Sequence, residues 1–440
     1  MKIIFHAILL FSGSVFAQNA ARLFEADIQP AVFSVSKVMM HDVINPPAAS
    51  RYYAYCMAGA YEIVSQNNSS IVPLSKLVKS YTAHFIQTNK SEYNYKIAAL
   101  YCMMETGKLM LPSGYMLQDD EDEFVKGLKR NDIPENIISK SLAVAQEIAA
   151  SIVQYSRGDN YNKLSTKLRY TPLKGDQYWY PTPPAYIEAI EPNWRIIRPM
   201  FIESSDQFVP PALTPFSKDS TSGFYQLAKE VYNISINETQ ENINIANFWD
   251  CNPFTVSTSG HMMIGFKKIT PGGHWMNIAG IVSKKAKLNF DNAILVHSMV
   301  ALTLMDGFIS SWDEKYRSNR LRPETFINRY IDPKWLPILQ TPPFPEYTSA
   351  HSVISTASAA VLAYLLGDDF SFTDNSEIIY DIPPRNFKSF NQAASEAAIS
   401  RLYGGIHYRD GVENGQKEGK VLGAYIVEKI ISAGIQPFNK

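Results

Sequence analysis

Apolar residues recur at helical spacing along most of the chain, and prolines mark several points where one helix ends and another begins. Pro46 and Pro47 divide the pattern over residues 34–64 into two helices, because proline cannot continue a helix but begins one well. Pro134 begins a long helix in the same way. Further helices in this half of the chain are predicted over residues 70–86, 92–108 and 119–131.

Residues 158–222 interrupt this pattern with many Pro, Tyr and Trp residues. Proline restricts the backbone, and a disordered linker would not carry so many aromatic side chains, so we expect an ordered connection across the surface. This connection could clamp the helices or form a dimer contact, so the sequence leaves open whether the protein forms a homo-oligomer. Helical patterns return over residues 224–232, 242–249, 272–287, 290–316, 347–366, 390–403 and 410–433.

The chain shows no strand-period pattern long enough to suggest a sheet. The sequence therefore predicts an all-α fold of two packed helical bundles. We place the first bundle at residues 18–157 and the second at residues 223–440, with residues 158–222 as the connection.

Residues 1–17 have the pattern of a secretory signal peptide, with Lys2, an apolar run and Val15-Phe16-Ala17 before the expected cut. We therefore expect an exported protein, periplasmic or secreted. The residue directly after the cut is Gln18 rather than a cysteine, so we do not expect a lipid anchor. No later apolar run reaches the roughly 18–20 residues that span a bilayer. The mature chain is thus expected to have no integral membrane segment.

The net charge is −1 over 440 residues, and no basic excess points to nucleic acid. The three cysteines, Cys56, Cys102 and Cys251, form no CxxC motif and have no histidine at zinc spacing. We expect small buried apolar residues, although a Cys56–Cys102 pair stays open. His261 and His274 fall in Gly-containing segments predicted as loops, which makes both candidates for a pocket wall.

Three polar stretches between residues 315 and 410 have the groups needed to hold one tetrahedral oxyanion. The first, KYRSNRLRP, places Lys315 before a turn and Arg322 and Pro323 after it. Arginine offers a planar fork for two oxygens and lysine a compact point charge, so the pair suits an anion with several oxygens. A solvated basic face is the alternative for this stretch alone.

The second stretch, FPEYTSAHS, predicts a helix start with Ser349 as the N-cap and Ala350 and His351 in the first turn. Free N–H groups at a helix start favour negative charge. His351 could donate or take a proton near neutral pH. Capping explains Ser349, but it does not require a histidine beside it.

The third stretch, SRLYGGIHYRD, ends one helix with Ser400 and Arg401 and begins another with His407 and Asp410. A carboxylate near a histidine can fix its tautomer, so that the other ring nitrogen can attack or ligate. A capping Asp410 beside a partly exposed His407 is an equally simple interpretation.

The order K-x6-RP, P-x-Y-x-S-x-H and SR-x5-H-x2-D resembles the signature of the vanadium haloperoxidase and type-2 phosphatidate phosphatase superfamily. The stretches HDVINPPAASRYYAY, YWYPTPPAYIEAIEPNW and GGHWMNIA are similar to bacterial vanadium-dependent haloperoxidases, so the resemblance covers most of the chain. It implies a vanadium-chloroperoxidase-like fold with the active site in the C-terminal bundle. Integral-membrane lipid phosphatases of the superfamily have several spanning helices, a pattern that this sequence lacks.

The resemblance implies vanadate as the cofactor. Lys315, Arg322 and Arg401 would neutralise its oxygens. Ser349 and the backbone N–H of Ala350 would hydrogen-bond to them. The activity implied is the oxidation of a halide, iodide or bromide, by hydrogen peroxide to give hypohalous acid.

His407 would ligate the vanadium, and His351 would be the acid–base group for peroxide. A soluble exported acid phosphatase is the alternative, with phosphate in the place of vanadate. In that enzyme His407 would attack a phosphate ester, Asp410 would orient it, and His351 would protonate the leaving group. Three cations, a serine and two histidines argue against a third interpretation, a helical scaffold without activity.

Two positions depart from the family pattern. Ala350 stands where the family usually has glycine, and its methyl group puts halide range and turnover in question. Asp410 comes one residue before the family's aspartate, whose place is taken by Gly411. Trp312 and Phe344 would line the pocket, as in chloroperoxidase-like and bacterial iodoperoxidase-like enzymes, while core packing is their ordinary role.

Overall fold

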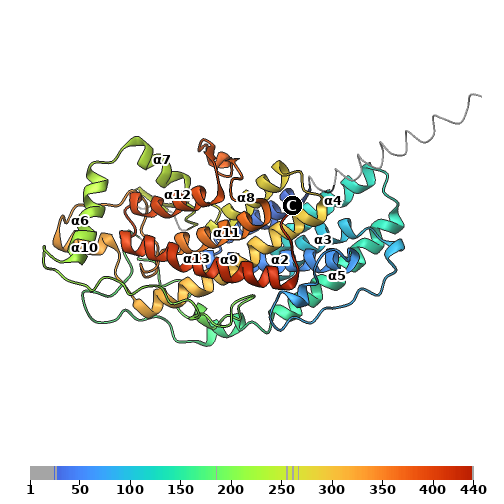
Figure 1. Ribbon diagram of the computed structural model, residues 1–440, viewed down its shortest axis with the longest axis horizontal. Helices are drawn as coiled ribbons and strands as arrows, with labels where there is room; N and C mark the ends of the chain where they lie inside the picture. The colour runs from blue at the N-terminus through green and yellow to red at the C-terminus, as the bar shows by residue number, and fades with distance from the viewer. Residues whose placement is uncertain are drawn as a thin grey trace, which may run out of the picture.

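The computed structural model describes Phe24, residues 27–184, 186–253 and 267–438, and the backbone of two short strands at 256–259 and 262–265. The expected signal peptide at residues 1–17 and the pocket candidate His261 lie outside the described residues. The described part is an all-α fold of packed helical bundles, elongated in the view of Figure 1.

The first half of the chain forms helices at one end of the molecule (Figure 1). The break at Pro46 separates a helix over residues 27–41 from α2, as predicted. Asn45 caps α2, because its side chain accepts a hydrogen bond from the N–H of Ala48. The helices are α2 (Pro46–Asn67), α3 (Tyr95–Met110), α4 (Leu117–Arg130) and α5 (Glu135–Ser156).

The helix predicted over residues 70–86 is wrong. That segment holds only a 3-10 turn, η1 (Leu74–Lys76), followed by irregular chain. Leu74, Leu77 and Val78 are buried at helix-like spacing, but the backbone N–H of Lys79 bonds to Met200 rather than to its own segment. A long-range partner for the backbone thus replaced the local helix.

The second half is built around α9, a 29-residue helix that contacts α2, α8, α11 and α13. It is the one helix among the described residues that is long and apolar enough to cross a bilayer, and its apolar window is wholly buried inside the fold. The helices are α6 (Gly223–Ile236), α7 (Gln240–Phe248), α8 (Pro271–Lys285), α9 (Phe290–Ser318), α10 (Pro323–Tyr330), α11 (Ala350–Leu366), α12 (Phe390–Tyr403) and α13 (Arg409–Ala433).

Helix α13 approaches α11 closely because its contact face is made of glycine. A Cβ at Gly415 would lie 2.8 Å from the carbonyl oxygen of Ser349, and one at Gly423 would lie 2.9 Å from the Cβ of Ala360. Gly411 and Gly419 continue the same face at intervals of four residues. The stripe lets the start of α13 lie directly against the start of α11.

The connection over residues 158–222 is ordered and contains buried aromatic residues. Trp179 and Trp194 are buried, and the backbone N–H groups at positions 200–202 all bond to the carboxylate of Asp306 on α9 at 2.7, 2.7 and 2.9 Å. The connection is thereby fastened to the central helix.

Two antiparallel hairpins are the strand structure of the described chain. Strand β1 (Val256–Ser259) pairs with β2 (Met262–Gly265), and β3 (Phe372–Asp374) pairs with β4 (Arg385–Phe387). Strands of three or four residues are too short to show a period-two pattern, which is why the sequence did not predict them.

Candidate active site

The three polar stretches converge at the starts and ends of five helices. Lys315 lies in the last turn of α9, and Arg322 lies directly before α10. Arg401 lies in the last turn of α12. Ser349 and His407 precede α11 and α13. Side chains from these elements surround a cavity of about 40 Å³, whose wall includes Trp312, Phe344, Ala350, His351, Arg401 and His407.

Three helices begin at this cavity. Pro46, Pro271 and Ala350 are the first residues of α2, α8 and α11, and all three line it. The free N–H groups and the positive dipole end of each helix favour negative charge. The backbone alone therefore makes the cavity attractive to an anion.

The three predicted cations are buried and have no carboxylate within ion-pair distance among the described residues. Lys315 donates to the carbonyl oxygens of Pro345, Glu346 and Thr348 at 3.2, 3.1 and 2.5 Å. Arg322 donates to the carbonyls of Phe344 and Ile406, and Arg401 to those of Trp249 and Ala246.

Burial lowers the pKa of Lys315, Arg322 and Arg401, and the charge of Arg322 adds to this for Lys315. Moreover, Nη2 of Arg322 is buried without a hydrogen-bond partner among the described residues. Buried positive charge without a counter-charge is costly. The cluster therefore needs an anion.

Phe344 covers two of these cations. Its ring lies 5.2 Å from Nζ of Lys315 and 5.0 Å from the guanidinium carbon of Arg322. The ring also packs against Trp312 at a centroid distance of 4.8 Å. Phe344 and Trp312 line the cavity, whereas Lys315 and Arg322 are not among its lining residues and lie against the Phe344 ring.

His407 is held as a neutral imidazole with a defined tautomer. Its Nδ1 lies 2.7 Å from Oε1 of Glu346, and its Nε2 lies 3.0 Å from Nη1 of Arg322. A carboxylate can only accept and a guanidinium can only donate, so the proton is on Nδ1 and the lone pair is on Nε2. Burial, and then the charges of Arg322 and Lys315, hold the pKa of His407 well below its ordinary value.

The prediction that Asp410 is the partner of His407 is wrong. Asp410 instead forms a bidentate ion pair with Arg320, whose Nη1 and Nη2 lie 2.7 and 2.8 Å from the two carboxylate oxygens. Arg320 in turn binds Oε2 of Glu346, the residue that contacts His407. Asp410 therefore reaches the histidine only through Arg320 and Glu346.

Gly411 explains this arrangement. A Cβ at that position would overlap Oε1 of Glu346 and lie 2.8 Å from Nη2 of Arg320. The carboxylate that contacts the histidine arrives from the loop before α11, and glycine leaves the room for it. Glu346 lies in the FPEYTSAHS stretch, three residues before Ser349. A carboxylate so close to the serine is the sequence feature that could have predicted the partner of His407.

His351 presents an unused nitrogen. Its ring hydrogen-bonds with the backbone of Trp249, and its Nε2 is buried without a partner among the described residues. Burial, followed by the charge of Arg401, holds the pKa of His351 well below its ordinary value. The group can therefore accept a proton once negative charge is placed in the cavity.

Ser349 is the N-cap of α11, as predicted, and its Oγ accepts a hydrogen bond from the N–H of Ser352. Ala350 is the first residue of that helix and is only 6% exposed. Helical backbone accepts alanine without strain, so the change from glycine affects the space in the cavity rather than the path of the chain.

His274 does not lie in a loop. It is the fourth residue of α8, fully buried, and bonded to Cys251, Glu377 and Asp374. Cys56 and Cys102 are free buried cysteines, as expected. Cys251 is buried too, but it lines the cavity, and the sequence spacing did not reveal its contact with a histidine.

Comparison with known proteins decides the family. The structure of a bacterial vanadium-dependent iodoperoxidase is 41% identical, with a TM-score of 0.85, and the match covers 92% of this chain and 96% of that chain. The chain belongs to the vanadium-dependent haloperoxidase family. The family model for the second helical-bundle domain of VCPO matches residues 295–433 of this haloperoxidase-family chain, which include the three polar stretches.

Two structures of a bacterial vanadium-dependent chloroperoxidase, in holo and apo form, share the haloperoxidase fold. They are 15% and 14% identical, with TM-scores of 0.65 and 0.66, over 89% and 88% of this chain and 94% of each of theirs. No match is found among curated protein sequences.

The haloperoxidase family implies a vanadate cofactor, and the described residues fit an oxyanion of that kind. Among the described residues, the three buried cations have no carboxylate within ion-pair distance, and Nη2 of Arg322 and Nε2 of His351 have no hydrogen-bond partner. Nε2 of His407 has a lone pair, which accepts from Nη1 of Arg322. By the usual space of about 10–15 Å³ for one water molecule, the cavity holds about three, which is on the scale of one tetrahedral oxyanion.

Proposed function

We propose that the protein is a vanadate-dependent haloperoxidase that uses hydrogen peroxide to oxidise halide to hypohalous acid. The observation that carries this proposal is that Arg401 and the neutral His407 line one small cavity, while two more buried cations lie against its Phe344 wall. Among the described residues, none of the three cations has a carboxylate within ion-pair distance. The 41% identity with a bacterial vanadium-dependent iodoperoxidase supports the same assignment. The reaction consumes one peroxide, one halide ion and one proton, and it gives one hypohalous acid and one water.

Lys315, Arg322 and Arg401 would balance the charge of the vanadate oxygens, Arg322 through its Nη2, which has no hydrogen-bond partner in the described part of the chain. Ser349 and the N–H of Ala350 would add hydrogen bonds at the start of α11. When bound, vanadate supplies a Lewis-acidic centre that binds hydrogen peroxide and makes its oxygen electrophilic toward halide.

His407 would hold vanadium through Nε2, in place of its hydrogen bond from Arg322, while Glu346 keeps the proton on Nδ1. Nε2 of His351 would take a proton from incoming peroxide and return it to the leaving oxygen. Burial and then the charge of Arg401 keep the pKa of His351 low, and a bound anion would offset that charge and bring the group toward the range in which it can exchange protons.

We propose iodide, and next to it bromide, as the preferred halide. The cavity wall includes the rings of Trp312 and Phe344, and Phe344 lies beside Lys315 and Arg322. An apolar wall favours the anion that loses the least hydration energy on leaving water. Iodide is the most weakly hydrated of the three common halides.

The direct test is a pair of assays on the purified full chain. After loading with orthovanadate, the rates of iodide, bromide and chloride oxidation by hydrogen peroxide are measured. Hydrolysis of an aryl phosphate is measured beside them without vanadate. We expect halide oxidation that depends on vanadate, and loss of it in His407→Ala. Phosphate release without halide oxidation would reject the proposal in favour of the acid phosphatase.

We also propose that residues 1–17 direct export and are removed, on the support of their sequence pattern. Determination of the N-terminus of protein recovered from outside the cytoplasm checks this. The expected first residue is Gln18, and a mature chain that begins at Met1 would contradict it.

A further inference from the structure

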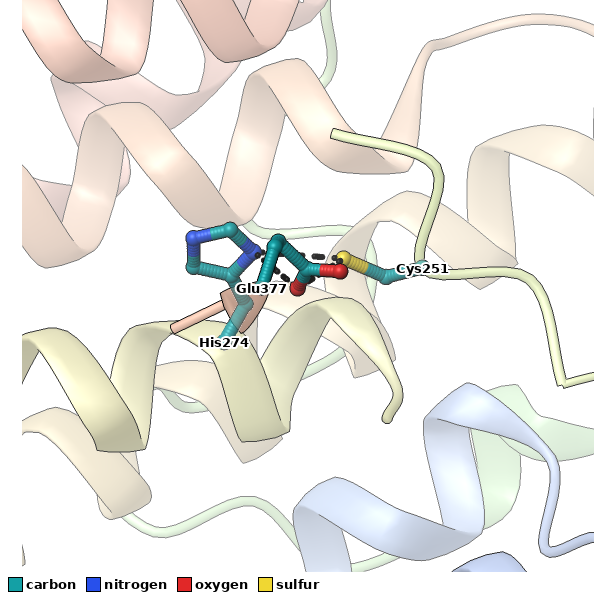
Figure 2. Close-up of side chains that lie close together, drawn as sticks. All are labelled: Cys251, His274 and Glu377. Carbon is teal, nitrogen blue, oxygen red and sulfur yellow. Dashed lines mark hydrogen bonds and ion pairs between the residues drawn. The ribbon is translucent and has the colours of Figure 1, made fainter. Parts of the chain in front are cut away.

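A second polar cluster lies next to the cavity and has no place in the proposed reaction. Figure 2 shows Cys251, His274 and Glu377 turned toward one another from three separate segments. Sγ of Cys251 lies 3.3 Å from Nδ1 of His274, which lies 3.1 Å from Oε1 of Glu377. The same carboxylate oxygen lies 4.0 Å from the sulfur.

The charges of this cluster do not balance among its own side chains. The second ring nitrogen of His274, Nε2, lies 2.7 Å from Oδ2 of Asp374, so one imidazole faces two carboxylates. All of these side chains are buried, and His274 is the ion-pair partner of both acids. Even a charged imidazole would leave one negative charge in the interior, which is costly.

One carboxylate oxygen of Glu377 is buried and unsatisfied in the described part of the chain. Its Oε2 has no hydrogen-bond partner among the described residues. Arg401 is close enough to act on Cys251 electrostatically, but its guanidinium donates to Ser400 and to backbone carbonyls rather than to Glu377. The cluster therefore contains one carboxylate that its protein neighbours do not fully satisfy.

The three donor atoms have the spacing of a tetrahedral metal site. Zinc bonds of about 2.0–2.3 Å to oxygen, nitrogen and sulfur put neighbouring donors about 3.3–3.6 Å apart. The observed separations of 3.3, 3.1 and 4.0 Å differ from this by a few tenths of an ångström. Thiolate and imidazole select zinc over magnesium or calcium, which prefer oxygen ligands.

The surroundings have the features that support a ligating histidine. Asp374 accepts from Nε2 and thereby leaves Nδ1 free to ligate. The ring of Trp249 stacks on the imidazole at 4.5 Å and fixes its plane. Asp374 is in turn anchored by the N–H of Ser376.

We propose that Cys251, His274 and Glu377 bind one Zn²⁺ ion, with a water molecule as the fourth ligand. Binding would release the thiol proton of Cys251, and that of the imidazole where it carries one, to solvent. The ion would tie the segment before β1 to α8 and to the turn after β3. Because Cys251 lines the cavity, this bond also fixes the wall beside Arg401 and His351.

The test measures metal content and ligand type on the full chain, without vanadate. After incubation with Zn²⁺ and removal of free metal, elemental analysis is expected to find one zinc per chain, and the thermal midpoint is expected to rise with zinc. Co²⁺ in place of Zn²⁺ is expected to give the thiolate-to-cobalt charge-transfer band and the intense visible bands of tetrahedral cobalt. A folded wild-type chain that retains no zinc and gives no such band would overturn the proposal.

Variants separate the cluster from other cysteines. Cys251→Ser is expected to abolish the charge-transfer band, whereas Cys102→Ser, at a buried cysteine of α3, is expected to keep it. Asp374→Asn, which alters the support and not a ligand, is expected to weaken zinc binding by about 10- to 100-fold. Retention of the band in folded Cys251→Ser would overturn the assignment, and none of these readouts depends on halide oxidation.

Discussion

Oε1 of Glu346 lies 2.7 Å from Nδ1 of His407, and this contact, rather than one with Asp410, orients the histidine. Glu346 lies in the loop before α11, and His407 directly precedes Tyr408, the N-cap of α13. Arg320 joins Glu346 to Asp410 behind the histidine. The imidazole is therefore positioned by a chain of charged groups, each buried or nearly so.

Glu346→Gln is expected to lower vanadate affinity and halide turnover by about 10- to 100-fold, the usual effect of losing the support of a metal-ligating histidine. Gln can still accept from Nδ1, but it removes the charge that stabilises the ligating tautomer. Vanadate titration and steady-state kinetics measure the two effects. Asp410→Asn, the matched control, is expected to cause a smaller loss because it acts only through Arg320. The reverse order would restore Asp410 as the functional partner.

Gly411→Ala is expected to reduce activity strongly in the wild-type background, because the new methyl group would overlap Oε1 of Glu346. In a Glu346→Ala background the same change should cost much less. A double-mutant cycle on vanadate affinity therefore gives a coupling energy of about 0.5–3 kcal/mol for contacting residues. Additive effects would show that Glu346 does not occupy the space above Gly411.

Arg322→Ala is expected to weaken vanadate binding by about 1.5–3 kcal/mol, which is about 10- to 150-fold, as for the loss of a hydrogen bond between charged groups. Binding is followed by vanadate titration of activity and by direct calorimetry. Arg329→Ala is the control, because this nearby arginine is partly exposed and pairs with Asp176. Equal vanadate affinities for the two variants would exclude Arg322 from the anion site.

Because His297 is buried as a neutral imidazole, we expect the stability of the fold to fall in acid. His297 is buried on α9 with Nδ1 bonded to the carbonyl of Ala293, and burial lowers its pKa to about 4. Because the folded-state pKa lies below the unfolded value of about 6.5, the neutral imidazole contributes stability that is complete above that value and is lost as the pH falls toward 4.

His297→Gln removes this titration and can still donate to the carbonyl. Denaturant unfolding at about pH 7 and about pH 5 is expected to show that the variant loses about 2 kcal/mol less stability than the wild type between the two conditions. The buried His351 and His407 titrate in the same direction, so both proteins should still weaken in acid. Equal losses in wild type and variant would show that His297 is not held neutral by the fold.

Much of the helical fold could be read from local patterns. The start of α2 at Pro46, the cap at Ser349 and the end of α11 at Gly367 each depend on a few neighbouring residues. The failures came where the backbone found a distant partner, as at Lys79, or where strands were only a few residues long.

The sequence by itself brought out the candidates for the anion site, because the cations, the serine and the two histidines stand in three short stretches whose order resembles a family signature. Which groups touch was decided by the tertiary structure. The glycine face of α13 lets that helix lie close to α11, and the space at Gly411 admits Glu346 beside His407, while Asp410 pairs with Arg320. The contact of Cys251 with His274 and Glu377 likewise joins positions 23 and 126 residues apart. Side-chain partners at such separations follow from how whole helices pack, so the local spacing of residues does not predict them.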